Sequence, residues 1–243
     1  MTHQSSTQKY SVHPFSFTVG LALILATASA LIIAAPASGE SSLSPETQIP
    51  KTQNTKAQTP KPQTLDSTSA RAIFAGGCFW CMEEAFERVE GVSAAISGYI
   101  GGHLSQPSYQ QVSSGGTGHT EAIEVLYNPK VIDYQTLLSI FWSNIDPLDA
   151  QGQFCDKGSQ YRSGIFFVGP QQHELAQSSK DELSRSQVLK GTIQTEITAA
   201  TTFYPAEDYH QDYYLKNPNR YQFYKWNGGR KQRLTQLWGK AEH

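Results

Sequence analysis

From residue 70 onward, apolar positions switch between strand-like and helical spacing. Arg71 to Ala75 is a short apolar run, and Gly76 and Gly77 follow it directly. Residues 78–89 then carry apolar side chains at helical intervals. A period of two predicts a strand, paired glycines predict a tight turn, and a period near 3.6 predicts a helix. The domain therefore begins with a strand, a turn and a helix.

The same alternation continues to about residue 200. Strand-like patterns cover 92–99, 120–127, 161–168 and 193–197, and helical patterns cover 134–142 and 170–189. This order predicts an α+β fold in which helices pack on a mixed or antiparallel sheet. We expect the last segment, 216–243, to pack over this domain.

The first 38 residues differ from the rest. An apolar stretch runs from Phe17 to Ala35, and Lys9 is the only Lys, Arg, Asp or Glu before Glu40. A positive residue, an apolar run and then small residues are typical of a cleaved signal peptide. The stretch is also long enough to span a bilayer as an uncleaved anchor. Both alternatives predict an extracytoplasmic protein that is periplasmic, secreted or membrane-anchored.

Residues 39–69 are rich in Pro, Ser, Thr and Gln and lack large apolar clusters, which predicts a disordered linker. Only Tyr10, Phe15 and Phe17 among the aromatic residues precede Phe74. Residues 70–243 therefore hold the single folded domain, including a C-terminal extension, and we expect it to be a monomer. The net charge is −2, without a basic cluster, which argues against nucleic acid as a partner.

The cysteines supply the candidate chemistry. Three are present, Cys78, Cys81 and Cys155. An odd number in an exported chain argues against a purely structural set of disulfides. Cys78 stands at the predicted helix start, where free backbone N–H groups and the helix dipole favour a thiolate. This position predicts a nucleophile with a lowered pKa, and a small buried residue in a tight turn is the alternative.

Cys78 and Cys81 also form a Cys-x-x-Cys pair. Residues three apart on a helix lie close enough for a disulfide with modest adjustment, as in thioredoxin-like motifs. A zinc site is the other use of this spacing, but the chain has no second cysteine pair and no histidine pair at ligand spacing. We therefore predict no metal.

Six motifs occur in the order found in a known family. They are Gly77-Cys78-Phe79-Trp80, Gly98-Tyr99-Ile100-Gly101-Gly102, Pro107-Ser108-Tyr109, Thr117-Gly118-His119-Thr120-Glu121-Ala122, Gly158-Ser159-Gln160-Tyr161-Arg162-Ser163 and Ala206-Glu207-Asp208-Tyr209-His210-Gln211. In these motifs the chain resembles the A-type peptide methionine sulfoxide reductases, over about Arg71 to Tyr214. The resemblance implies a ferredoxin-like plait with family-specific extensions. It also implies reduction of methionine S-sulfoxide, in proteins and free, by thiolate attack, sulfenic acid and disulfide formation.

Reduction of a sulfoxide needs an acid beside the attacking sulfur, because the departing oxygen gains negative charge. The resemblance gives each role to a residue: Glu121 as the acid, Tyr109 and Tyr161 as hydrogen-bond donors to the oxygen, Phe79 and Trp80 as the wall for the methyl group, and Asp156 as an orienting residue. A solvated glutamate and ordinary core tyrosines are the alternatives.

The resulting disulfide needs a second cysteine. Many members of the family place it near the C-terminus, but Lys225 to His243 contains none. We prefer Cys155, in a Gly-rich loop beside Asp156, with Cys81 as the alternative. The resemblance further implies a thioredoxin-like dithiol as the reductant and no bound cofactor. Two other functions remain open: a general thiol-disulfide oxidoreductase using Cys78 and Cys81, and a non-catalytic binder of methionine-rich peptides.

Overall fold

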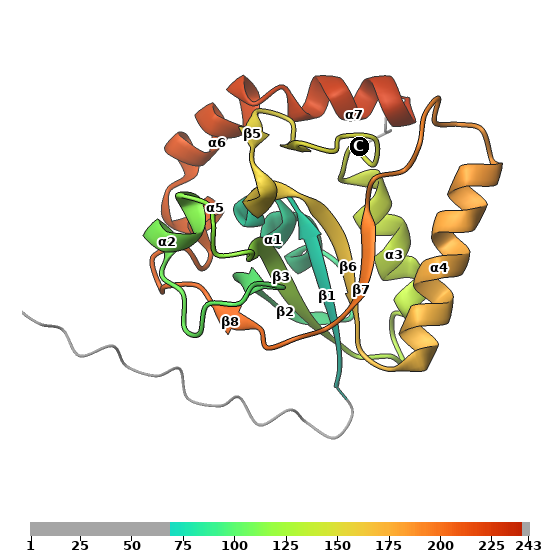
Figure 1. Ribbon diagram of the computed structural model, residues 1–243, viewed down its shortest axis with the longest axis horizontal. Coiled ribbons are helices and arrows are strands. Elements are labelled where there is room, and N and C mark those ends of the chain that lie inside the picture. The colour runs from blue at the N-terminus through green and yellow to red at the C-terminus, as the bar shows by residue number, and fades with distance from the viewer. Residues whose placement is uncertain (1–68, 240–243) are drawn as a thin grey trace, which may run out of the picture. The chain divides into compact units, whose positions relative to one another are not determined.

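A computed structural model describes residues 69–239 of the chain (Figure 1). The predicted targeting segment 1–38 and all but the last residue of the predicted linker 39–69 lie outside the described residues. Within residues 69–239, no helix combines the length and the apolar character needed to cross a membrane.

A six-stranded sheet with the order β7-β6-β1-β3-β2-β8 lies at the centre of the domain. Its strands are β1 (Ala70–Gly76), β2 (Val92–Ile100), β3 (Thr120–Tyr127), β6 (Ser163–Phe167), β7 (Glu196–Ala199) and β8 (Tyr204–Pro205). Neighbouring strands are antiparallel except β6 and β7, which run parallel. The predicted mixed sheet is confirmed.

The helices are α1 (Phe79–Glu87), α2 (Tyr109–Ser113), α3 (Tyr134–Ser143), α4 (Pro170–Arg185), α5 (Tyr213–Lys216), α6 (Pro218–Asn227) and α7 (Arg230–Trp238), with one 3₁₀ helix, η1 (Ser159–Tyr161). The sequence β1-α1-β2-β3-α3-β6 and the spatial order β6-β1-β3-β2 correspond to the plait that the resemblance implied.

The alternation of side chains along β1 divides the core into two layers. Ala72 and Phe74 belong to the larger layer, which contains buried residues of α1, α3 and α4. Ile73 and Ala75 belong to the smaller layer on the other face, where Phe203 packs against them. The covering helices lie mainly beside and behind the sheet in the view of Figure 1.

Several boundaries differ from the prediction. Tyr161 belongs to η1 rather than to the following strand. Helix α4 ends at Arg185, since Gln187 has a positive φ that a continuing helix does not allow. The last strand of this region covers Glu196–Ala199 rather than 193–197. These boundaries depend on tertiary contacts and local backbone geometry that the apolar pattern does not encode.

Two segments have more structure than the sequence suggested. The predicted loop around Cys155 is a tight hairpin of β4 (Gly152–Gln153) and β5 (Asp156–Lys157). The C-terminal extension forms α6 and α7, drawn in red along the edge of the domain in Figure 1. The start of α7 is fixed at the end of β1, because the Arg230 guanidinium donates a hydrogen bond to the Gly76 carbonyl at 2.9 Å.

Candidate active site

Cys78 is the N-cap residue of α1, directly after the turn that ends β1. Gly77 has φ +79°, and a Cβ atom there would lie 2.5 Å from the Cβ of Gln153. Only glycine allows both this backbone conformation and the close approach of the β4–β5 hairpin. Gln153 is itself fixed by two hydrogen bonds of 2.8 Å to the backbone of Asp146. The paired glycines thus bring the hairpin against the helix start that carries Cys78.

A cavity of about 60 Å³ opens beside Cys78. Its lining residues are Cys78, Phe79, Trp80, Tyr109, Glu121, Asp156, Tyr161 and Tyr224. The first seven are the residues for which the sequence predicted catalytic or substrate-binding roles, and they come from α1, α2, β3, β5 and η1. Tyr224 comes from α6 and was not predicted. The structure thus brings the seven predicted side chains to one place.

Glu121 is 3% exposed, and its Oε2 accepts a hydrogen bond of 3.0 Å from the backbone N–H of Phe79. Burial raises the pKa of Glu121 to about 8, and this amide lowers it only in part. A carboxyl group with this pKa is mostly protonated at neutral pH. Glu121 is therefore able to donate a proton into the cavity.

Cys78 and Cys81 are both 5% exposed and lie in one buried cluster. Burial raises the pKa of Cys78, and the neighbouring Cys81 and Glu121 raise it further. The prediction of a lowered pKa at Cys78 is therefore wrong for the free enzyme, because desolvation outweighs the helix start. The pKa of Cys81 is instead lowered to about 6, since the Cys78 S–H donates a hydrogen bond to its sulfur. The pair shares one proton at neutral pH.

Tyr109 and Tyr161 keep their phenolic protons. Burial raises the pKa of Tyr109 to about 12, and it raises the pKa of Tyr161 as well. Both hydroxyls thus remain hydrogen-bond donors at the cavity. Glu207 holds the start of α2, accepting a 2.8 Å hydrogen bond from the Tyr109 N–H and a 2.9 Å bond from the Tyr99 hydroxyl.

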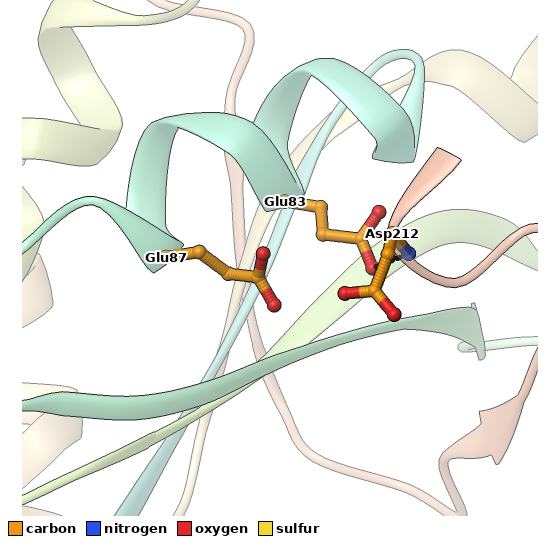
Figure 2. A group of neighbouring side chains, drawn as sticks. All are labelled: Glu83, Glu87 and Asp212. Carbon is orange, nitrogen blue, oxygen red and sulfur yellow. Dashed lines mark hydrogen bonds between the residues drawn. The ribbon is translucent and has the colours of Figure 1, made fainter. Parts of the chain in front are cut away.

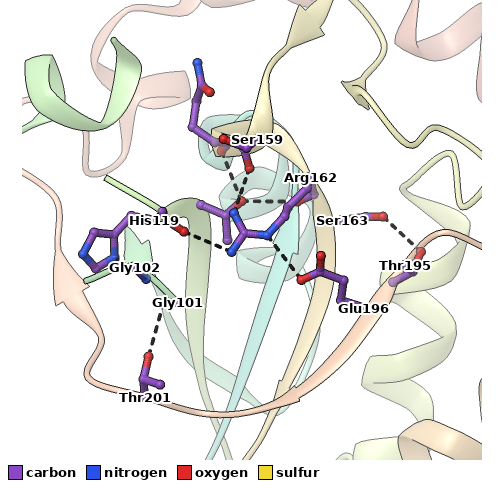
Figure 3. Close-up of polar contacts among 12 residues, drawn as sticks. Gly101, Gly102, His119, Ser159, Arg162, Ser163, Thr195, Glu196 and Thr201 are labelled. Atoms are coloured by element: carbon purple, nitrogen blue, oxygen red, sulfur yellow. Dashed lines mark hydrogen bonds and ion pairs between the residues drawn. The ribbon is translucent and has the colours of Figure 1, made fainter. Parts of the chain in front are cut away.

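Arg162 fixes the segment that carries Tyr161 (Figure 3). Its guanidinium donates to the carbonyl oxygens of Ser159 at 2.8 Å and Gly118 at 3.2 Å, and it pairs with Glu196 at 3.3 Å. Gly118 belongs to the turn that precedes β3, the strand that carries the acid. Arg162 therefore joins the element that supplies a cavity hydroxyl to the one that supplies the carboxyl group.

The aromatic wall of the cavity depends on a histidine for which the sequence predicted no role. The Trp80 indole stacks on Tyr213 at 3.8 Å and donates a 3.1 Å hydrogen bond to Nδ1 of His210. Burial lowers the pKa of His210 to about 4, so the ring is neutral at pH 7 and can accept this bond. The same ring lies 5.0 Å from Phe79 and 4.3 Å from Tyr109. His210 was visible in the sequence only as part of a motif.

Asp156 and Cys155 are adjacent in the hairpin but have different environments. The Asp156 carboxylate lines the cavity and accepts a 2.5 Å hydrogen bond from the Tyr224 hydroxyl. Cys155 is exposed, with its sulfur 3.8 Å from Asp156 Oδ1 and packed against Gly228. The cavity lining contains Asp156 and not Cys155.

One group of carboxylates in the described part of the chain could hold a cation (Figure 2). Glu83, Glu87 and Asp212 have ligand atoms within 4.8 Å of one another. Burial raises the pKa of Glu83 to about 8, and its Oε1 accepts a 3.0 Å bond from the Asp212 N–H. None of the three lines the cavity. Their contacts connect α1 to the start of α5.

Comparison with known proteins gives one consistent result. The family model for peptide methionine sulfoxide reductase matches residues 70–242. The chain is 48% identical over 168 residues to a peptide methionine sulfoxide reductase MsrA of Bacillus subtilis, covering 69% of this chain and 95% of the relative. It is 52% identical over 151 residues to a peptide methionine sulfoxide reductase MsrA of Streptococcus agalactiae, and the match covers 62% of this chain and 89% of the relative.

Two solved structures resemble the fold. Reduced Mxr1 of Saccharomyces cerevisiae is 32% identical with a TM-score of 0.59, covering 67% of this chain and 91% of that structure. Methionine sulfoxide reductase A of Corynebacterium diphtheriae is 32% identical with a TM-score of 0.57, covering 63% and 77%.

Proposed function

Because the chain belongs to the peptide methionine sulfoxide reductase family, we propose that Cys78 is the sulfur that takes the oxygen from the substrate. The family identifies the chain as a thiol-dependent oxidoreductase that reduces methionine sulfoxide, as the resemblance implied. One observation supports the roles of the individual residues: the protonated, buried Glu121 lines the same 60 Å³ cavity as Cys78 and two protonated phenols.

In the first step, the Cys78 sulfur attacks while its proton passes to Cys81, the hydrogen-bonded partner in the pair. Glu121 gives its proton to the sulfoxide oxygen, and the hydroxyls of Tyr109 and Tyr161 bind that oxygen. Donors placed where negative charge develops are typically the largest contribution to such catalysis. The oxygen ends on Cys78 as a sulfenic acid, so Cys78 is oxidised and methionine is released in reduced form.

The aromatic wall favours the substrate's methyl group. Phe79 and Trp80 present ring surfaces to the cavity, and a methyl group on sulfur packs well against ring edges. His210 holds the indole in place by accepting its N–H. Asp156, fixed by Tyr224, orients the polar side of the cavity. We carry the preference for the S epimer of the sulfoxide over from the family as part of this proposal.

In the second step, the Cys81 thiol condenses with the sulfenic acid to form a disulfide and water. We now place this role on Cys81 rather than on Cys155. The Cys81 sulfur is in hydrogen-bond contact with Cys78, whereas Cys155 is exposed and does not line the cavity. A thioredoxin-like dithiol then reduces the disulfide. This assignment reverses our preference from the sequence.

The sequence of the N-terminal segment supports a location outside the cytoplasm for this chemistry. Residues 1–38 have the pattern of a signal peptide or anchor, and residues 39–69 that of a spacer. Methionine sulfoxides in exported proteins and peptides are the substrates that such a placement implies, and the domain acts as a monomer. Fractionation of cells followed by N-terminal sequencing of the mature chain separates a cleaved from an anchored form.

The test of the proposed reaction uses each separated sulfoxide epimer of a blocked methionine, with dithiothreitol as the reductant. We expect the wild type to consume the S epimer and Cys78→Ser to consume neither. A general thiol-disulfide oxidoreductase would instead reduce insulin disulfides and tolerate Glu121→Gln. Equal turnover by the wild type and Cys78→Ser would refute the assignment of the attacking sulfur.

A further inference from the structure

The C-terminal extension surrounds the resolving thiol rather than only covering the domain. Tyr221 of α6 is fully buried and packs in one cluster with Cys78 and Cys81. Its hydroxyl donates a 2.5 Å hydrogen bond to Glu84, and the same hydroxyl is within hydrogen-bond reach of the Cys81 sulfur. The extension therefore places a phenol beside the second thiol of the pair, and the single proton of its hydroxyl is donated to Glu84.

Two cations accompany this hydroxyl. Lys225, one turn further along α6, forms a 2.5 Å ion pair with Glu84, which lies one helical turn after Cys81. Arg88 pairs with the same carboxylate at 2.7 Å. Glu84 thus anchors both Tyr221 and Lys225 on the side of α1 that carries Cys81. The two cations together offset the negative charge of Glu84.

Arg230, the first residue of α7, is 6% exposed. Its guanidinium donates to the carbonyl oxygens of Gly76 at 2.9 Å and Asn144 at 2.5 Å, and it lies 4.4 Å from the centre of the Phe154 ring. No carboxylate in residues 69–239 forms an ion pair with it. A buried cation without a compensating anion is costly. Its nitrogen is 4.0 Å from the sulfur of Met82, the residue after Cys81.

Resting on the proposed function, we propose that Arg230, Tyr221 and Lys225 are positioning residues that hold Cys81 as the anion of the thiol pair and thereby make it the resolving cysteine. The Cys81 thiolate adds a negative charge near the buried guanidinium, which forms no ion pair and otherwise interacts with the Asp156 carboxylate at longer range. The hydrogen bond from Cys78 is the main cause of the lowered pKa of Cys81, and Arg230, Tyr221 and Lys225 lower it further, in agreement with this arrangement.

The charge also directs the second step. After oxygen transfer, Cys78 is a sulfenic acid and Cys81 holds the proton taken from Cys78. The positive surroundings favour loss of that proton again as the Cys81 sulfur attacks. The S–S bond forms, the S–O bond of Cys78 breaks, and the hydroxide leaves with the released proton as water. Cys155 lacks these cations, and partial burial together with the adjacent Asp156 carboxylate raises its pKa instead.

The first test measures the thiol of Cys81 alone. In the full chain, the Cys78→Ser/Cys155→Ser variant leaves Cys81 as the single thiol, and the ultraviolet absorbance of the thiolate gives its pKa. We expect a value below the ordinary thiol pKa of about 8.5. Adding Arg230→Met should raise the pKa by about one unit or more, a tenfold loss of thiolate. Lys231→Met is the matched control, because it removes the same charge from an exposed position on the same helix.

The second test follows one turnover in an otherwise wild-type chain. Methionine release is measured together with trapping of the sulfenic acid by dimedone and mapping of the disulfide. We expect Arg230→Met to release one methionine and to form the disulfide about tenfold more slowly, so that trapped sulfenic acid accumulates. Arg230→Lys should restore much of the rate, and Lys231→Met should match the wild type. Tyr221→Phe keeps the buried ring and should slow disulfide formation to a smaller extent. It replaces Arg230→Met in this test if that variant does not fold.

The outcomes separate the two proposals. A wild type that releases no methionine refutes the proposed function. Methionine release followed by a Cys78–Cys155 disulfide leaves that function intact and overturns the inference. An unchanged Cys81 pKa in both Arg230→Met and Tyr221→Phe also overturns it.

Discussion

Replacement of Glu121 by glutamine tests the acid at the centre of the site. The substitution keeps the size and the hydrogen-bond acceptor for the Phe79 N–H, but removes the proton that the carboxyl group donates. Loss of a general acid typically lowers the rate by about 10² to 10⁴-fold. We expect a loss of that size in the single-turnover release of methionine at pH 7, while Glu124→Gln on the same strand serves as the matched control.

Glu121→Gln should also change the pH dependence of the rate of methionine release. The pKa of Glu121 is about 8, so in the wild type the acid form is lost as the pH rises through 8. The alkaline decrease in the rate of methionine release should therefore be present in the wild type and absent in Glu121→Gln. An unchanged alkaline decrease in the variant would show that another group titrates there.

The same substitution should raise the free energy of unfolding at alkaline pH, although it lowers the rate. Burial raises the pKa of Glu121 from its ordinary value of 4.5 to about 8, and a raised carboxyl pKa favours folding only while the group is protonated. The contribution is complete below pH 4.5 and is lost progressively up to about pH 8. At 1.36 kcal/mol for each pKa unit, the free energy of unfolding of the wild type falls by about 5 kcal/mol over this range, relative to the variant with an uncharged glutamine.

Urea unfolding of both proteins at pH 4.5 and pH 9 measures this difference. We expect Glu121→Gln to gain several kcal/mol relative to the wild type at the higher pH, with Glu124→Gln as the control. A difference between the two proteins that does not depend on pH would contradict the neutral, buried carboxyl group. A variant that keeps more than a tenth of the wild-type rate would refute its role as the acid.

Five further substitutions test the rest of the site. Cys81→Ser should release one methionine and then fail to turn over with thioredoxin, whereas Cys155→Ser should cycle like the wild type; the reverse pattern in a coupled NADPH assay would return the resolving role to Cys155. Tyr109→Phe and Tyr161→Phe should each lower kcat/KM by about 10- to 100-fold, since each removes one donor to the developing oxyanion, and the loss should appear mainly in kcat. Tyr224→Phe should lower the rate about tenfold, because it removes a charge-assisted hydrogen bond to a partly buried carboxylate; a rate equal to the wild type would show that this hydroxyl only packs.

The sequence by itself determined the local parts of this protein. The glycine turn, the cysteine at the helix start and the strand that carries Glu121 follow from spacing and backbone preference within a few residues of each position. The order of strands and helices predicted the fold class for the same reason. The motifs contain six of the seven predicted cavity residues, and the same resemblance supplied Asp156, since none of these residue types is specific by itself.

Only the tertiary structure decided the charge states and the partners. The sequence placed the thiolate on Cys78 because a helix start favours an anion, but burial reverses that preference and the pair carries its charge on Cys81. The hydrogen bond from Cys78 is the main cause, and the further causes include side chains of α6 and α7, more than 130 positions away, which no local pattern connects to the cysteines. Desolvation and charge act through space, so the pKa of a buried group depends on which distant segments the fold brings against it.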